Sequence, residues 1–139
     1  MSLNYARFTV AYWCVLIAVL LPYACTYLAK YPGFGKPRSK GGYDNVEPRA
    51  WLAKQQGFNA RANAAEANTF EALPFFIGAV IIAHLLGAPQ TRVDILAVLF
   101  VTLRIIYVAL YVAGLSTARS AIWALALLAN IAIFLSGWR

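Results

Sequence analysis

Four long apolar runs, separated by polar segments, form the main pattern along this chain. A helix needs about 20 residues to cross the hydrocarbon core of a bilayer, and inside lipid its backbone groups must be hydrogen-bonded within the crossing segment. Each run meets that length, so the pattern predicts an all-α integral membrane protein, a four-transmembrane-helix bundle forming a single domain over residues 1–139. The expected spans are about 8–28, 60–87, 93–113 and 118–138, with a long first loop over 30–59.

Composition supports this interpretation and excludes an ordinary soluble domain. Hydrophobic residues make up 62% of the chain and charged residues 12%, whereas soluble domains are roughly half apolar and a quarter charged. The two cysteines, Cys14 and Cys25, lie three turns apart on the first predicted helix, so they cannot pair with each other within one chain. We interpret both as small apolar packing residues.

The basic residues are divided unevenly between the two sides of the predicted bundle, and their distribution sets its orientation. The side with the first and third loops carries eight of them, and the side with the termini carries three. The positive-inside rule then places the 30–59 loop in the cytoplasm and both termini outside it. The net charge of +7 therefore reflects orientation, and no nucleic-acid partner is expected. The eight are Lys30, Lys36, Arg38, Lys40, Arg49, Lys54, Arg61 and Arg119; the three are Arg7, Arg92 and Arg139.

The long loop is rich in Gly, Pro and Lys, which predicts an irregular and partly mobile segment. Its simplest role is to anchor the protein to anionic lipid head groups. A share in covering a ligand site is the alternative.

A stripe of polar side chains continues from the cytoplasmic end of the second helix into the membrane. Arg61, Asn68 and Glu71 recur at helical spacing on one side of this helix. Glu71 lies ten residues past Arg61, or roughly 15 Å at 1.5 Å per residue, and Arg104 on the third helix lies at a matching depth. Because unpaired charges inside a membrane are costly, we predict an ion pair between Glu71 and Arg104.

The third helix extends this polar cluster back towards the cytoplasm. Tyr107 and Tyr111 share a face with Arg104, and Arg119 and Ser120 open the fourth helix. Unpaired N–H groups at a helix start already favour an anion, so an arginine there suits a thiolate or a carboxylate. The cluster therefore predicts a site for a polar, anionic ligand that enters from the cytoplasm. A purely structural pair that locks two helices together is the alternative.

Two further polar residues receive structural interpretations. His84 lies thirteen residues past Glu71 on the opposite face, where we expect an interfacial or packing histidine, and nothing near it indicates a metal site. Asn130 lies three turns past Arg119 on the same face, where a hydrogen bond to another helix is expected.

Taken together, these motifs resemble the MAPEG family, the membrane-associated proteins in eicosanoid and glutathione metabolism. The resemblance covers nearly the whole chain. It rests on Arg61-x6-Asn68-x2-Glu71-x2-Pro74-Phe75 in the second helix, Arg104-x2-Tyr107-x3-Tyr111 in the third, and Arg119-Ser120-Ala121 after it.

The resemblance implies a homotrimer that binds glutathione as co-substrate between neighbouring protomers, in a pocket facing the cytoplasm. It implies that Asn68 and Glu71 contact the peptide part of glutathione and that Arg119 activates its thiol, with Ser120 beside it. The implied glutathione-binding residues are Arg61, Asn68, Glu71, Arg104, Tyr107 and Tyr111.

The expected function is a membrane-bound glutathione transferase for detoxification, with glutathione peroxidase as a further activity, acting on lipophilic molecules from the surrounding lipids. Ala64 stands where eicosanoid-making members have a further arginine, which argues against a dedicated eicosanoid synthase. Short MAPEG sequences of this type are typical of a bacterial inner membrane. Two alternatives remain: a non-catalytic MAPEG-like binding or scaffold protein, and a small four-helix transporter. The transporter is disfavoured because its characteristic first-helix acid is missing between Arg7 and Lys30.

Overall fold

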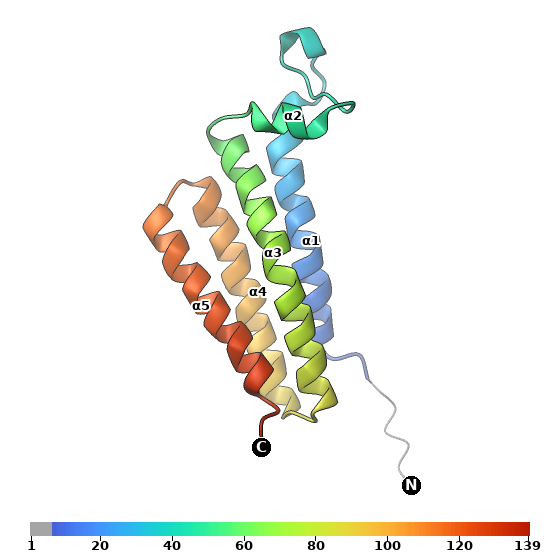
Figure 1. Cartoon of the computed structure of the whole chain (residues 1–139), viewed down its shortest axis with the longest axis vertical. Helices are drawn as coiled ribbons and strands as arrows, with labels where there is room; N and C mark the ends of the chain where they lie inside the picture. The colour runs from blue at the N-terminus through green and yellow to red at the C-terminus, as the bar shows by residue number, and fades with distance from the viewer. Residues whose placement is uncertain (1–6) are drawn as a thin grey trace.

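The computed structural model describes residues 7–139, and four long antiparallel helices dominate it (Figure 1). Each is long and apolar enough to cross a membrane, which confirms the predicted four-helix membrane bundle. The helix ends differ from the expected spans by at most three residues. The long helices are α1 (Val10–Lys30), α3 (Phe58–Leu85), α4 (Gln90–Val112) and α5 (Ser116–Leu135), and a short helix α2 (Pro48–Ala53) lies before α3.

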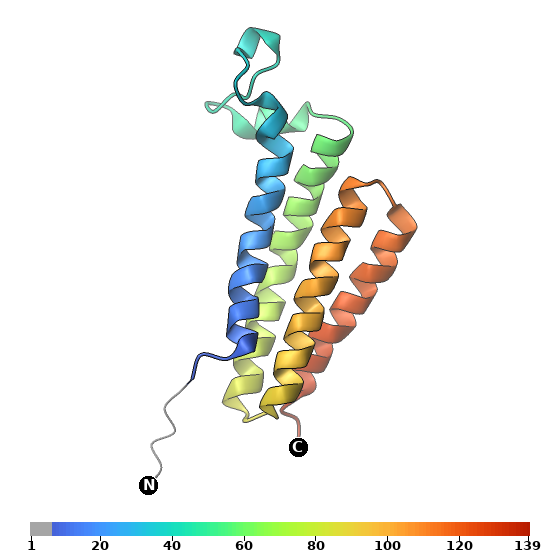
Figure 2. The ribbon, with the colours of Figure 1, turned by 180° about the vertical axis from the view of Figure 1, so that it is seen from behind.

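The two middle helices, α3 and α4, pack against each other and against both outer helices. Figure 2 shows α1 and α5 on opposite flanks of the bundle. Small residues such as Ala11, Ala79 and Ala97 are buried where the helices meet, and they allow the backbones to approach closely. Cys14 and Cys25 are buried and free, as expected of packing residues.

Most of the apolar surface faces outwards. In the most apolar part of each span only 22% to 39% of the residues are buried within the protomer. Lipid tails are as apolar as leucine, so these faces need no protein cover to be stable in a bilayer. The small buried fraction also leaves lateral surface on which other protomers can pack.

Tight turns join the last three helices and place their ends side by side. Gly87 and Gly114 follow α3 and α4 with φ of 66° and 78°, a left-handed conformation that costs glycine little. The Leu115 N–H donates to the Leu110 carbonyl at 3.0 Å, which closes the end of α4. The second turn therefore places the start of α5 directly beside the end of α4.

The 30–59 loop is more regular than its composition predicted. It contains two 3₁₀ turns, η1 (Tyr31–Gly33) and η2 (Arg38–Lys40), and then α2, which lies across the ends of α1 and α3 (Figure 1). A contact between Gly33 and the Trp51 ring leaves no room for a Cβ, and the Tyr43 N–H donates to the Gly33 carbonyl at 2.9 Å. The prediction of an irregular segment missed this fold because the contacts join residues far apart in a glycine-rich stretch.

Candidate functional site

Two adjoining cavities between α3, α4 and α5 contain all but one of the residues that the sequence assigned to a site. The first, the polar cavity, has a volume of about 310 Å³. The second, the deep cavity, has a volume of about 210 Å³ and is mostly apolar. Asn68 and Trp123 line both, so the two cavities share a wall. The polar cavity is lined by Asn68, Tyr107, Tyr111, Arg119, Ser120 and Trp123.

A chain of contacts between cations and aromatic rings runs from Arg104 in the deep cavity to Arg119 in the polar cavity. The guanidinium carbon of Arg104 lies 4.2 Å from the centre of the Tyr107 ring, and that of Arg119 lies 4.2 Å from the centre of the Tyr111 ring. The two tyrosine rings meet edge to face with their centres 5.7 Å apart. Such contacts hold an arginine in place while leaving its N–H groups free to donate. Arg104, Tyr107, Tyr111 and Arg119 of the predicted polar cluster are therefore in contact in that order.

The predicted ion pair between Glu71 and Arg104 is wrong. Within residues 7–139 no nitrogen of Arg104 lies within 4.0 Å of the Glu71 carboxylate. Arg104 donates instead through Nη2 to Asn68 Oδ1 at 3.0 Å and to Thr69 Oγ1 at 3.2 Å. The Thr69 hydroxyl donates to the Ala65 carbonyl at 2.6 Å, so its oxygen is free to accept from the arginine.

The physical reason lies in burial. Arg104 is 2% exposed, while Glu71 is exposed on the surface of the protomer. Two neutral acceptors, two and three residues before Glu71 on α3, bond the arginine Nη2 without burying a second charge, and burying a second charge is expensive. Both charged groups still line the deep cavity. Arg104 and Glu71 therefore face the same cavity without pairing, and the Glu71 carboxylate can bind a ligand there.

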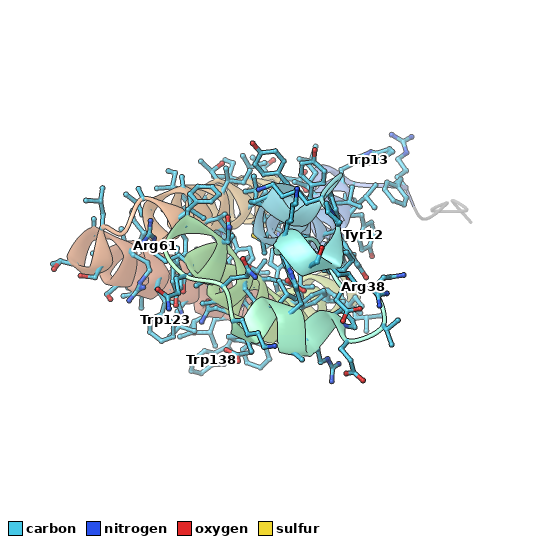
Figure 3. The ribbon with its side chains drawn as sticks, turned by 90° about the horizontal axis from the view of Figure 1, so that it is seen from above. Tyr12, Trp13, Arg38, Arg61, Trp123 and Trp138 are labelled. Carbon is cyan, nitrogen blue, oxygen red and sulfur yellow. The ribbon has the colours of Figure 1, made fainter. Side chains whose placement is uncertain are left out.

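Arg61 stands apart from the other predicted site residues because it lines neither cavity. Its Nε donates to the Val112 carbonyl at 2.9 Å, which satisfies an orphan acceptor at the end of α4. Figure 3 shows Arg61 and Trp123 on the same side of the bundle, away from Tyr12 and Trp13. Arg61 therefore fastens α3 to the turn before α5 at the edge of the site.

The start of α5 also differs from the expectation. The helix begins at Ser116, two residues earlier than predicted, so Arg119 is its fourth residue and its own N–H donates to the Leu115 carbonyl at 3.0 Å. The anion-binding capacity at this position therefore lies mainly in the guanidinium group, with Ser120 lining the same cavity.

Sequence reasoning missed two residues of the site for which signals were present. Thr69 directly follows Asn68, and a threonine within a helix can accept from a neighbouring arginine while its hydroxyl bonds the preceding turn. Trp123 lies four residues after Arg119, on the same helical face, and this spacing could have identified it. It is the aromatic wall common to both cavities.

The model of the MAPEG family matches residues 10–138, nearly the whole chain, so the chain belongs to the MAPEG family. This family includes membrane glutathione transferases and related proteins, among them some that are not enzymes. Searches of curated proteins and of solved structures gave no match.

Proposed function

We propose that this MAPEG protein is a membrane-bound glutathione transferase that joins glutathione to lipophilic electrophiles. One observation carries the proposal: a polar cavity containing Arg119, Ser120 and two tyrosines adjoins a mostly apolar cavity through Asn68 and Trp123. A polar tripeptide and an apolar partner can therefore be held in contact, and such proximity is a large part of two-substrate catalysis.

Arg119 is the group that we assign to thiol activation. A free thiol with a pKa near 8.5 is mostly protonated at neutral pH, and lowering that value by about 2 units requires about 2.7 kcal/mol of preference for the thiolate. A guanidinium donor in a site partly shielded from water supplies interactions of this size. The Ser120 hydroxyl is placed to donate a second hydrogen bond to the sulfur.

The remaining polar residues hold the peptide part of glutathione. The Arg104 guanidinium attracts a carboxylate, and the exposed Glu71 carboxylate attracts the ammonium group. Asn68 can contact the peptide groups between them, because it lines both cavities. This division of roles is supported by the cavity lining, because Asn68, Glu71 and Arg104 all line the deep cavity and Asn68 also lines the polar one.

The chemistry requires no group beyond the two substrates. The thiol proton passes to water, and the thiolate forms a C–S bond as a leaving group such as chloride departs with its electron pair. With a hydroperoxide, the thiolate takes the terminal oxygen to give an alcohol and a sulfenic acid. A second glutathione then converts the sulfenic acid to a disulfide and water, so peroxidase activity is part of the same proposal.

Family membership and the charge distribution also support a proposal for the assembly and the location. We propose a homotrimer in which a neighbouring protomer covers the lateral opening of the site, since Glu71 is exposed within one protomer. The basic 30–59 loop lies on the cytoplasmic side of a bacterial inner membrane, with both termini on the other side. Glutathione then enters from the cytoplasm, and the lipophilic substrate comes from the bilayer.

Turnover of 1-chloro-2,4-dinitrobenzene by the detergent-purified protein tests the proposal. Arg119→Ala should lower kcat/KM at least about a hundredfold, or about 2.7 kcal/mol of transition-state stabilisation, and abolish the ultraviolet absorbance of bound thiolate. Arg92→Ala removes an exposed arginine at the opposite end of α4 and serves as the matched control. Unchanged turnover in Arg119→Ala would remove that residue from the mechanism.

The same samples separate the competing functions. A non-catalytic binding protein of this family would be stabilised by glutathione, because a ligand that binds only the folded state raises its stability, but it would show no turnover. A transporter without a glutathione site would show neither effect.

A further inference from the structure

The deep cavity contains two buried polar atoms that the protein leaves without a hydrogen-bond partner. They are Arg104 Nε and Asn130 Oδ1, and neither is bonded by any of the described residues. The two side chains are 2% and 3% exposed. Buried polar atoms are usually satisfied, so each exception requires an explanation.

Asn130 is the more informative of the two. The sequence predicted that it would bond another helix, but within residues 7–139 its Oδ1 accepts no hydrogen bond. The side chain lines the deep cavity instead, eleven residues beyond Arg119, which is about 16 Å along α5. Burying a polar side chain this deep in the membrane costs more free energy than burying an apolar one. A ligand with a polar group of its own would offset that cost by bonding Asn130.

The walls around Asn130 define the rest of the ligand. They consist of one alanine from α3, two phenylalanines, the Trp123 ring, and an alanine and a leucine from α5. Asn68, Glu71 and Arg104 line the same cavity, where we assign them to glutathione, so a second ligand would occupy the apolar part between them and Asn130. Such a ligand is apolar along its length and polar where it meets Asn130. The apolar wall residues are Ala72, Phe75, Phe100, Trp123, Ala126 and Leu127.

We infer that the deep cavity binds an elongated apolar molecule with a hydroxyl group at its inner end, and that Asn130 recognises this hydroxyl. A hydroxyl donates and accepts, so it satisfies the asparagine amide in either orientation. The other end of the molecule lies at the shared wall of Asn68 and Trp123. The claim that the deep cavity binds such a molecule rests on the cavity alone. The further claim that this molecule is the second substrate rests on the proposed transferase function.

The test compares two unreactive probes, methyl decanoate and its ω-hydroxy derivative, by their effect on thermal unfolding of the purified full-length protein. We expect the wild type to bind the hydroxylated ester about tenfold more tightly, the effect of one net hydrogen bond. Asn130→Leu should abolish this preference and leave binding of the plain ester unchanged. Asn63→Leu makes the same exchange at a half-buried asparagine of α3 that lines neither cavity, and it should keep the preference.

Three results would overturn the inference. These are no stabilisation by either ester, equal stabilisation by both in the wild type, and a preference that survives in Asn130→Leu. If Asn130 instead bonded a neighbouring protomer, Asn130→Leu would change the oligomeric state on size-exclusion chromatography and weaken both esters equally. The binding test uses no glutathione, so its result does not depend on the transferase assay. If the transferase assay failed and the ester preference were observed, the deep cavity would remain a ligand site but would not be a substrate site.

Discussion

The bundle contains two clusters of polar side chains, one around the deep cavity in its middle and one at the end where α1 begins, and they are built in opposite ways. The site cluster, consisting of Asn68, Glu71, Arg104 and Asn130, surrounds a cavity and keeps unsatisfied polar atoms. The end cluster joins the start of α1, the end of α3 and the start of α4, and the protein itself satisfies it. Its members are Thr9, Tyr12, His84, Gln90 and Asp94.

Hydrogen bonds in the end cluster form a closed set around His84. Its Nδ1 lies 2.7 Å from the Val80 carbonyl, which can only accept, so Nδ1 carries the proton. Its Nε2 then accepts from the Thr9 hydroxyl at 3.0 Å, and the ring stacks on Tyr12 with centroids 4.3 Å apart. The sequence predicted an interfacial or packing histidine, and the structure places it in a packed network.

Asp94 completes the end cluster. One carboxylate oxygen accepts from the Ala11 N–H at 3.0 Å and from Gln90 Nε2 at 2.8 Å. The first contact satisfies an orphan donor in the first turn of α1 and places a negative charge at the positive end of that helix. A fully partnered cluster of this kind fixes the helices, whereas a partly partnered cluster beside a cavity is suited to binding.

Arg104→Met gives the largest effect that separates the two clusters. The substitution removes a buried charge whose desolvation is costly and also removes two hydrogen bonds, to Asn68 and Thr69. These effects offset each other, so the unfolding temperature should change little. Glutathione loses a charged partner, so kcat/KM should fall about a hundredfold, or about 2.7 kcal/mol. Thermal unfolding and steady-state kinetics on the same preparation measure both quantities. A variant that unfolds would show that Arg104 is as structural as the end cluster, and the comparison would fail.

The sequence alone predicted which polar residues lie on one face but not which atoms pair. Helical periodicity placed Asn68, Glu71 and Arg104 around one space, because the 100° step between residues is nearly constant. It could not choose between Glu71 and Asn68 as the partner of Arg104, because about one turn of relative axial shift between α3 and α4 decides which of them the guanidinium meets. Only the packing of small residues between the helices sets that shift.

The contact of Asp94 was even harder to predict from the sequence. Its contact with Ala11 joins residues 83 positions apart, on the first and the third of the long helices. No local pattern marks the pair, since it depends on where α1 starts relative to α4. Four spans, by contrast, follow from length and hydropathy alone, which is why they were predicted to within three residues at each end.

Asp94→Leu should have the opposite profile to Arg104→Met. It leaves the Ala11 N–H and the Gln90 amide without their acceptor, so the free energy of unfolding should fall by about 2 kcal/mol. Turnover well below the unfolding temperature should be unchanged, because Asp94 lines neither the polar cavity nor the deep cavity. Asp94→Asn keeps an acceptor oxygen and should lose less stability. A large loss of activity in a still folded Asp94→Leu would mean that the two clusters are coupled.

Arg61→Gln should have the smallest effect of the three substitutions. The sequence motif assigns Arg61 to the glutathione site, whereas its hydrogen bond in the structure joins α3 to the end of α4. Its hydrogen bond to Val112 satisfies the end of α4, so its loss should lower the free energy of unfolding by about 1 kcal/mol. Glutathione half-saturation should stay the same, since Arg61 lines neither cavity. Denaturation curves and glutathione titrations measure the two effects. A higher glutathione concentration at half-saturation, with unchanged stability, would show that Arg61 binds glutathione. It would also mean that a neighbouring protomer or a bound ligand moves the side chain away from α4.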